Sequence, residues 1–152
     1  MAAVEEAEFE IFHLSSYTEN LSREAKERYF HKLSTIDIDC PYSIDCSFWL
    51  KDDKAVDILP NFTYIDLITY IMYSKSPYTK KNLKAYKSLD AYKRLTQQLF
   101  GSFEGVRLNN KVTVFRGKVG HSMAVTQTPL YPWVALAENG SVIGAHCTCP
   151  AG

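Results

Sequence analysis

The sequence has little that suits a membrane-spanning or secreted protein. No apolar run approaches the ~20 residues that a membrane-spanning helix needs, and the longest, 61–73, contains Asp66. The chain starts with an acidic stretch rather than with the basic and then apolar layout of a secretory signal. Four cysteines in 152 residues are too few for a disulfide scaffold. We therefore expect an intracellular protein, nuclear or cytoplasmic, with no membrane partner.

Catalytic motifs are also missing. The sequence holds no phosphate-binding loop, no HExxH pattern and no nucleophile elbow. Its four histidines, His13, His31, His121 and His146, are scattered along the chain. No Cys–His or Ser–His–Asp arrangement can be argued from them. We therefore expect neither an enzyme nor a small-molecule substrate.

The formal net charge of zero hides an uneven distribution. Residues 1–74 carry fourteen acids and six bases, residues 75–118 carry eleven bases and two acids, and residues 119–152 carry only Glu138. This asymmetry indicates a basic surface, provided that the basic side chains face one way. In the alternative, the acidic and basic parts face each other or form an ordinary solvated surface.

The basic segment has the composition of a nucleic-acid contact. Lys80, Lys84 and Lys87 would share one face of a helix, because they are spaced i, i+4 and i+7. Lys93 and Arg94 follow on the next predicted helix, and tyrosines are interleaved with these bases. Lysine contacts phosphates and tyrosine stacks on unpaired bases, so the five residues are candidate nucleic-acid-binding residues. In the alternative, the tyrosines pack in the core and the lysines line its solvent edge.

Hydrophobic periodicity predicts helices up to about residue 104. Ser22 suits a helix N-cap, and Ala25, Tyr29 and Leu33 repeat at the spacing of a buried stripe. A second helix is predicted over 63–73, where a capping box begins the helix and apolar residues occupy nearly every face. Such a helix is expected to run through the core. Two short basic helices are predicted after it, the second ending at Gly101.

From Gly105 the periodicity becomes that of strands. Asn139-Gly140 best suits a two-residue type I′ turn with positive φ at both residues. The sequence therefore predicts a hairpin in which 132–138 pair antiparallel with 141–147. The predicted fold class is α+β. It has a flexible tail over 1–13, a region of three to four helices over 14–104, and a small antiparallel β-sheet with an Asn-Gly hairpin over 105–152.

The sequence ends in Ala145-His-Cys-Thr-Cys-Pro-Ala-Gly152. Cys147 and Cys149 would point to the same side of a strand, because side chains alternate with period two. Two thiolates can form half of a tetrahedral zinc site, which needs four ligands. His146 would point the other way. Cys40 and Cys46 are alternative sources of the other two ligands, although their spacing does not match usual ligand patterns.

Several segments resemble a known family. Gly-Lys-Val-Gly-His-Ser over 117–122, Pro-Leu-Tyr-Pro-Trp-Val over 129–134, Asn-Gly-Ser-Val over 139–142 and the final eight residues resemble the opening of a SWIM-type zinc finger. Upstream, Leu-Ser-Arg-Glu-Ala-Lys-Glu-Arg-Tyr and the segment Lys84–Tyr92 resemble largely uncharacterised, mobile-element-derived animal proteins. In many of these, a SWIM finger precedes a YqaJ-type viral recombinase domain. The resemblance covers roughly residues 14–152.

The resemblance implies that Cys147 and Cys149 are the first two zinc ligands of an incomplete site. The family pattern continues with a Cys-x-His on a following helix, which these 152 residues do not contain. The chain therefore looks truncated within the finger, and zinc is expected only if a downstream Cys-x-His completes the site. The implied function is a non-catalytic, nucleic-acid-binding accessory region with DNA or RNA as its partner. The alternative is a protein–protein interaction module with no nucleic-acid role.

Overall fold

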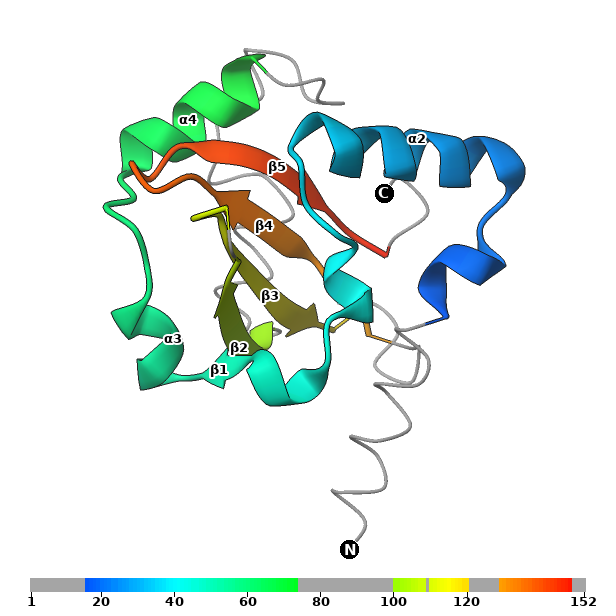
Figure 1. The fold of residues 1–152 in the computed structure, drawn as a ribbon. Helices are drawn as coiled ribbons and strands as arrows, with labels where there is room; N and C mark the ends of the chain where they lie inside the picture. The colour runs from blue at the N-terminus through cyan, green and yellow to red at the C-terminus, as the bar shows by residue number, and fades with distance from the viewer. Residues whose placement is uncertain (1–15, 74–99, 109, 121–128, 149–152) are drawn as a thin grey trace, which may run out of the picture. The chain divides into compact units, whose positions relative to one another are not determined.

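The computed structural model describes residues 16–73, 100–108, 110–120 and 129–148 (Figure 1). The chain divides into two units, and the division falls between Trp49 and Leu50. The helical elements of the first unit are η1 (Tyr17–Asn20), α2 (Arg23–Thr35), η2 (Pro41–Ser43) and η3 (Cys46–Phe48). The second unit contains β1 (Leu50–Lys51), α3 (Asp53–Asp57), α4 (Tyr64–Tyr73), β2 (Phe100–Arg107), β3 (Thr113–Val119), β4 (Trp133–Leu136) and β5 (Val142–His146).

Helix α2 begins and packs as its sequence predicts. The side-chain oxygen of Ser22 accepts the N–H of Ala25 at 3.3 Å, which satisfies one of the amides that the first turn leaves unpaired. Tyr29 and Leu33 are buried, and Ala25 on the same stripe is half-buried. The N-cap and the apolar stripe are therefore both confirmed.

An aromatic cluster surrounds Tyr29 in the first unit. The Tyr17 ring meets Tyr29 edge-on with centroids 5.7 Å apart, and it meets Tyr42 edge-on at 4.9 Å. These edge-to-face arrangements are the ones that aromatic quadrupoles favour. The Tyr29 hydroxyl lies 3.2 Å from the Cys40 sulfur, and the two share a hydrogen bond. The loop between η2 and α2 is thereby tied to the helix.

The five strands form one antiparallel sheet in the order β1-β2-β3-β4-β5 (Figure 1). The α+β fold class is confirmed. The sheet begins earlier than predicted, at Phe100, and it takes β1 from the region that the sequence assigned to helices. A strand of two residues is too short to show any periodicity, which explains why β1 was missed. The predicted basic helices fall mainly on 74–99, outside the described residues.

One face of the sheet carries a cluster of core residues of the second unit. Ala55, Phe115 and Leu136 are buried together, and the partly buried residues around them are Ile58, Phe62, Phe103, Val134 and Val142. Phe103 and Phe115 stack with ring centroids 5.2 Å apart. Gly105, which is paired with Phe115, leaves room for that ring, since a Cβ there would come within 2.7 Å of it. Short helix α3 supplies Ala55 to this face.

The opposite face carries a row of five residues that are in register across all five strands. Lys51 pairs with Glu104, Glu104 with Arg116, Arg116 with Trp133, and Trp133 with His146. Because paired residues of neighbouring strands lie on the same face, we call these five residues the cross-strand row. Trp133 is 2% exposed and sits near its centre.

Helix α4 contacts β5 and starts with the predicted capping interaction (Figure 1). The Thr63 N–H donates to Asp66 Oδ2 at 2.8 Å, which is one half of a capping box. The prediction that this helix runs through the core is wrong. Tyr64, Ile65 and Leu67 are 57%, 74% and 38% exposed. Helix α4 packs against an edge strand, so part of its apolar surface faces solvent.

The β4–β5 hairpin has the predicted strands but a different turn. Trp133, Val134 and Ala135 pair with His146, Ala145 and Gly144, which is the register that a two-residue turn would give. The register then shifts, and Leu136 pairs with Val142. Ala137 N–H donates to Ser141 at 2.8 Å and Gly140 N–H donates to Ala137 at 2.9 Å, so the loop has three residues.

The backbone angles explain the correction to the turn type. Gly140 has φ of +90°, whereas Asn139 is not among the described residues with positive φ. A tight turn followed by a left-handed glycine is the usual three-residue hairpin loop with a bulge. The type I′ prediction is therefore wrong, because only one of its two positions adopts positive φ.

Candidate functional site

The structure places one of the predicted zinc ligands directly after β5. Cys147 follows His146 and is half-buried. Its predicted companion Cys149 lies outside the described residues, as do Lys80, Lys84, Lys87, Lys93 and Arg94. The geometry of the candidate site is therefore the geometry around Cys147.

Two hydrogen bonds hold the backbone on either side of Cys147. On one side, Tyr70 of α4 makes a hydrogen bond with the backbone of Ala145. On the other side, the Thr148 hydroxyl accepts the N–H of Tyr131 at 3.0 Å. Tyr131 is itself fixed by its neighbour, because Leu130 and Val119 exchange both backbone hydrogen bonds at 2.8 Å. Cys147 thus sits in a short segment that is anchored at both ends.

His146 lies on the face of the sheet that carries the cross-strand row. It pairs with Trp133 in the cross-strand row, and the two rings lie 6.1 Å apart at an angle of 39°. Because side chains alternate along a strand, Cys147 is expected on the face opposite to His146. Because β5 ends at His146, the direction of the Cys147 side chain stays a prediction.

Cys40 and Cys46 both lie in the first unit. Cys40 is half-buried and its sulfur shares a hydrogen bond with Tyr29, whereas Cys46 in η3 is exposed. Among the described residues, no three His, Cys, Asp or Glu side chains are grouped so that they could hold a metal ion. The described part of the chain therefore does not supply a complete metal site.

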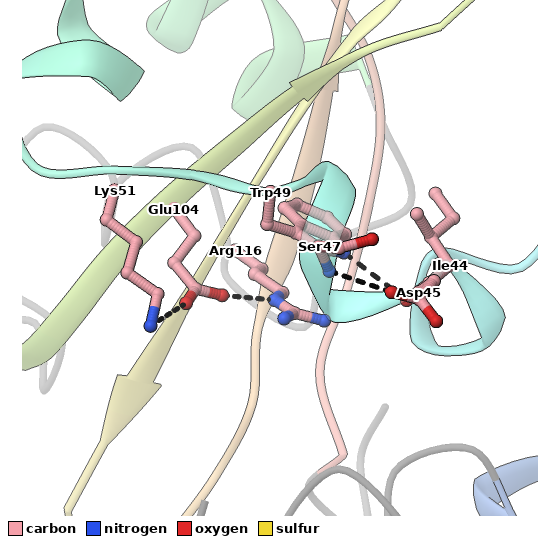
Figure 2. Close-up of polar contacts among 7 residues, drawn as sticks. All are labelled: Ile44, Asp45, Ser47, Trp49, Lys51, Glu104 and Arg116. Atoms are coloured by element: carbon pink, nitrogen blue, oxygen red, sulfur yellow. Dashed lines mark hydrogen bonds and ion pairs between the residues drawn. The ribbon is translucent and has the colours of Figure 1, made fainter.

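The cross-strand row contains an ion-pair network that the sequence did not reveal. Glu104 accepts a hydrogen bond from Arg116 Nε at 2.6 Å, and Lys51 Nζ lies 3.8 Å from the other Glu104 oxygen (Figure 2). The Glu104 and Arg116 side chains are only 15% and 12% exposed. Finding this pair requires the register of β2 against β3. The only sequence signal is the alternation of side chains along each strand, which does not by itself pair Glu104 with Arg116.

Several basic residues of the 75–118 segment are paired with acids in the sheet. Arg107 and Lys111 both contact Glu138, at 3.5 Å and 3.6 Å. Arg116 is held by Glu104. Neither acid belongs to residues 1–74, so these pairs leave untested the alternative in which the acidic part of the chain faces the basic part. A nucleic-acid role for the basic segment therefore depends on the bases upstream of β2.

Three groups have pKa values that depart from the ordinary ones. Burial raises the pKa of Tyr70, and the hydrogen bond with Ala145 opposes that effect. Burial lowers the pKa of Lys32 on α2. Hydrogen bonds from Ser47 lower the pKa of Asp45, with the Ser47 N–H donating at 2.8 Å (Figure 2). The first two shifts come from packing and the third from a local turn, so none of them marks a catalytic group.

Comparisons with known proteins add no relative. The chain matches no protein-family model, no curated protein and no solved structure. Among the described helices, none has the length and apolar character needed to cross a membrane.

Proposed function

We propose that this chain is a non-catalytic accessory region of a SWIM-type zinc-finger protein and that it contacts nucleic acid. Cys147 and Cys149 are the first two metal ligands in this proposal. The observation that supports it is the double anchoring of the Cys147 backbone, through Ala145 to Tyr70 and through Thr148 to Tyr131. A metal ligand on a rigid element keeps its geometry before the metal arrives.

Zinc would have a structural role here. Two thiolates supply half of the four ligands that a structural zinc site needs. No Cys-x-His occurs in the 152 residues, so the remaining ligands would come from sequence outside them. The chain by itself is therefore expected to bind zinc weakly or not at all.

A cobalt titration tests the metal part of the proposal. Co²⁺ substitutes for Zn²⁺ and reports thiolate coordination by its absorption. The chain alone should give no tight, stoichiometric binding, whereas the chain extended through a Cys-x-His should bind tightly. In the extended chain, Cys147→Ser should abolish this binding, and Cys46→Ser, at an exposed position in the other unit, is the matched control. Tight binding by the unextended chain would contradict the half-site and reopen the pairing with Cys40 and Cys46.

The nucleic-acid part depends on Lys80, Lys84, Lys87, Lys93 and Arg94. We expect modest affinity with little sequence preference, because lysine contacts phosphate rather than base edges. Fluorescence anisotropy with single-stranded and double-stranded DNA at increasing salt measures this, since phosphate binding weakens steeply with salt. Replacing Lys80, Lys84 and Lys87 by glutamate should remove binding and leave the circular dichroism unchanged. Unaltered affinity for DNA in that triple variant would show that these three lysines do not bind nucleic acid.

A second candidate, a protein-interaction module, is favoured by the exposed apolar residues of α4. Ile65 is 74% exposed and Tyr64 is 57% exposed, and contiguous exposed apolar side chains are a feature of protein-interaction sites. If the chain binds no DNA even at low salt, the protein-interaction module is favoured over the nucleic-acid-binding region. Binding to a protein partner should then be lost in Ile65→Ser and retained in the lysine triple variant.

A further inference from the structure

The β4–β5 loop places a reactive dipeptide under tight restraint. Asn139 is exposed and is followed by Gly140, whose backbone is buried. The Gly140 N–H donates to Ala137 at 2.9 Å, and the Asn139 side-chain oxygen accepts the N–H of Ser141 at 3.0 Å. A Cβ at Gly140 would overlap the backbone carbonyl of Asn61, so this loop packs closely against the segment before α4.

The chemistry of an Asn-Gly dipeptide is an intramolecular acyl transfer. The amide nitrogen of Gly140 loses its proton and attacks Cγ of Asn139. A new Cγ–N bond forms, the bond from Cγ to the side-chain nitrogen breaks, and ammonia leaves with the proton. Water then opens the five-membered imide at either carbonyl, giving aspartate or isoaspartate. Glycine hinders the attack least because it has no side chain.

We propose that Asn139 is a site of spontaneous deamidation and that opening of the β4–β5 loop controls its rate. The nucleophile is the backbone nitrogen of Gly140, whose N–H donates a hydrogen bond to the Ala137 carbonyl. A donated hydrogen bond favours the protonated form of a group, so it opposes the loss of the proton that the attack requires. The side-chain carbonyl is held toward Ser141 at the same time. Both bonds have to break before the nitrogen can reach Cγ, so the reaction proceeds from the locally opened loop.

The modification would change the hairpin permanently. Isoaspartate adds a methylene group to the backbone between Ala137 and Ser141, whose hydrogen bond at 2.8 Å closes the loop. It also places a new carboxylate beside Glu138, which already contacts Arg107 and Lys111. We therefore expect the modified chain to lose the loop geometry from which β5 runs toward Cys147.

Peptide mapping by mass spectrometry tests the proposal on the full chain. The protein is incubated at mildly alkaline pH in native buffer and in concentrated urea, and the conversion of amide to acid is followed at each asparagine. Asn139 should convert faster in urea than Asn61 and Asn110, which are followed by Phe62 and Lys111. In native buffer its conversion should be slower by at least about tenfold, as expected for a loop that is seldom open.

Hydrogen exchange at Gly140 provides the second measurement. If loop opening controls the reaction, the protection of the Gly140 amide should be of the same order as the slowing of deamidation. Equal conversion in native buffer and in urea would overturn the proposal, as would a protected Gly140 amide beside unslowed conversion. Conversion at Asn139 no faster than at Asn61 in urea would overturn it as well.

Discussion

Glu104 and Arg116 face each other across β2 and β3, and their hydrogen bond of 2.6 Å lies almost out of contact with water. Glu104 is also the residue that Lys51 of β1 approaches from the other side, at 3.8 Å. The carboxylate thus links three neighbouring strands through one face of the sheet (Figure 2).

Replacing Glu104 should destabilise the sheet strongly. Glu104→Ala removes a charged hydrogen-bond acceptor from the poorly solvated Arg116 guanidinium, so we expect the free energy of unfolding to fall by about 2–3 kcal/mol. Lys51→Ala is the matched control, and its cost should be about 0.5 kcal/mol or less, because exposed pairs contribute little. Urea denaturation measures both. An equal cost for the two variants would show that Arg116 does not depend on Glu104.

The Tyr70 hydroxyl should make stability sensitive to alkaline pH. Burial raises the pKa of Tyr70 in the folded chain, so the unfolded chain loses this proton first as the pH rises. The unfolded state then binds fewer protons, and stability falls as the pH rises above about 10. Below that pH the contribution of Tyr70 is fully present. Tyr70→Phe should lose about 1 kcal/mol at neutral pH, from the hydrogen bond with Ala145, and should show a shallower decline in alkali.

Urea denaturation across the alkaline range compares the native chain with Tyr70→Phe. Each protein is referred to its own stability at neutral pH, so that the lost hydrogen bond does not enter the comparison. Identical declines in the two proteins would exclude Tyr70 as a source of the alkaline sensitivity.

Gly140 should tolerate substitution much less than Asn139. Its φ of +90° disfavours any side chain, and a Cβ would overlap the Asn61 carbonyl. We expect Gly140→Val to cost at least about 1–2 kcal/mol from backbone strain alone. Asn139→Val loses only the hydrogen bond with Ser141, at a cost of about 1 kcal/mol. Thermal unfolding ranks the two, and a larger cost at Asn139 would be evidence for a two-residue turn after all.

Thr148 should control how well Cys147 is held. Thr148→Val keeps the shape of the side chain but removes the acceptor for the Tyr131 N–H. We expect a cost of about 1 kcal/mol and faster reaction of Cys147 with a thiol reagent, followed by peptide mapping. Thr148→Ser keeps the hydroxyl and should behave like the native chain. Slow reaction in Thr148→Val, as in the native chain, would show that the Thr148–Tyr131 bond does not restrain Cys147.

Local signals were readable from the sequence. Ser22 and the Thr63–Asp66 pair were found because capping is a matter of spacing within one turn. The first three pairs of the β4–β5 hairpin were also found, since strand periodicity and a turn signal fix a register together. The three-residue loop was missed because Asn-Gly is compatible with more than one turn, and the close approach of Asn61 is a tertiary feature.

Features that depend on distant segments could not be read in advance. The Glu104–Arg116 pair requires the register of two strands, and the exposure of Ile65 depends on α4 packing against an edge strand. At the candidate metal site, the sequence indicated Cys147 and Cys149 by their spacing and by family resemblance. It contained no signal for the anchoring of Thr148 by Tyr131, which are seventeen residues apart.

The pairing of β1 with β2 has a consequence for how the chain folds. Leu50 and Gly105 are partners in the sheet although residues 51–104 lie between them in the sequence. In contrast, β4 and β5 are joined by a three-residue loop. Closing a long loop costs more conformational entropy than closing a short one, and non-local pairings slow folding. The local pairings β2–β3 and β4–β5 should therefore form first, and the sheet should close last at β1. Lys51 then reaches Glu104 only when Arg116 already holds that carboxylate.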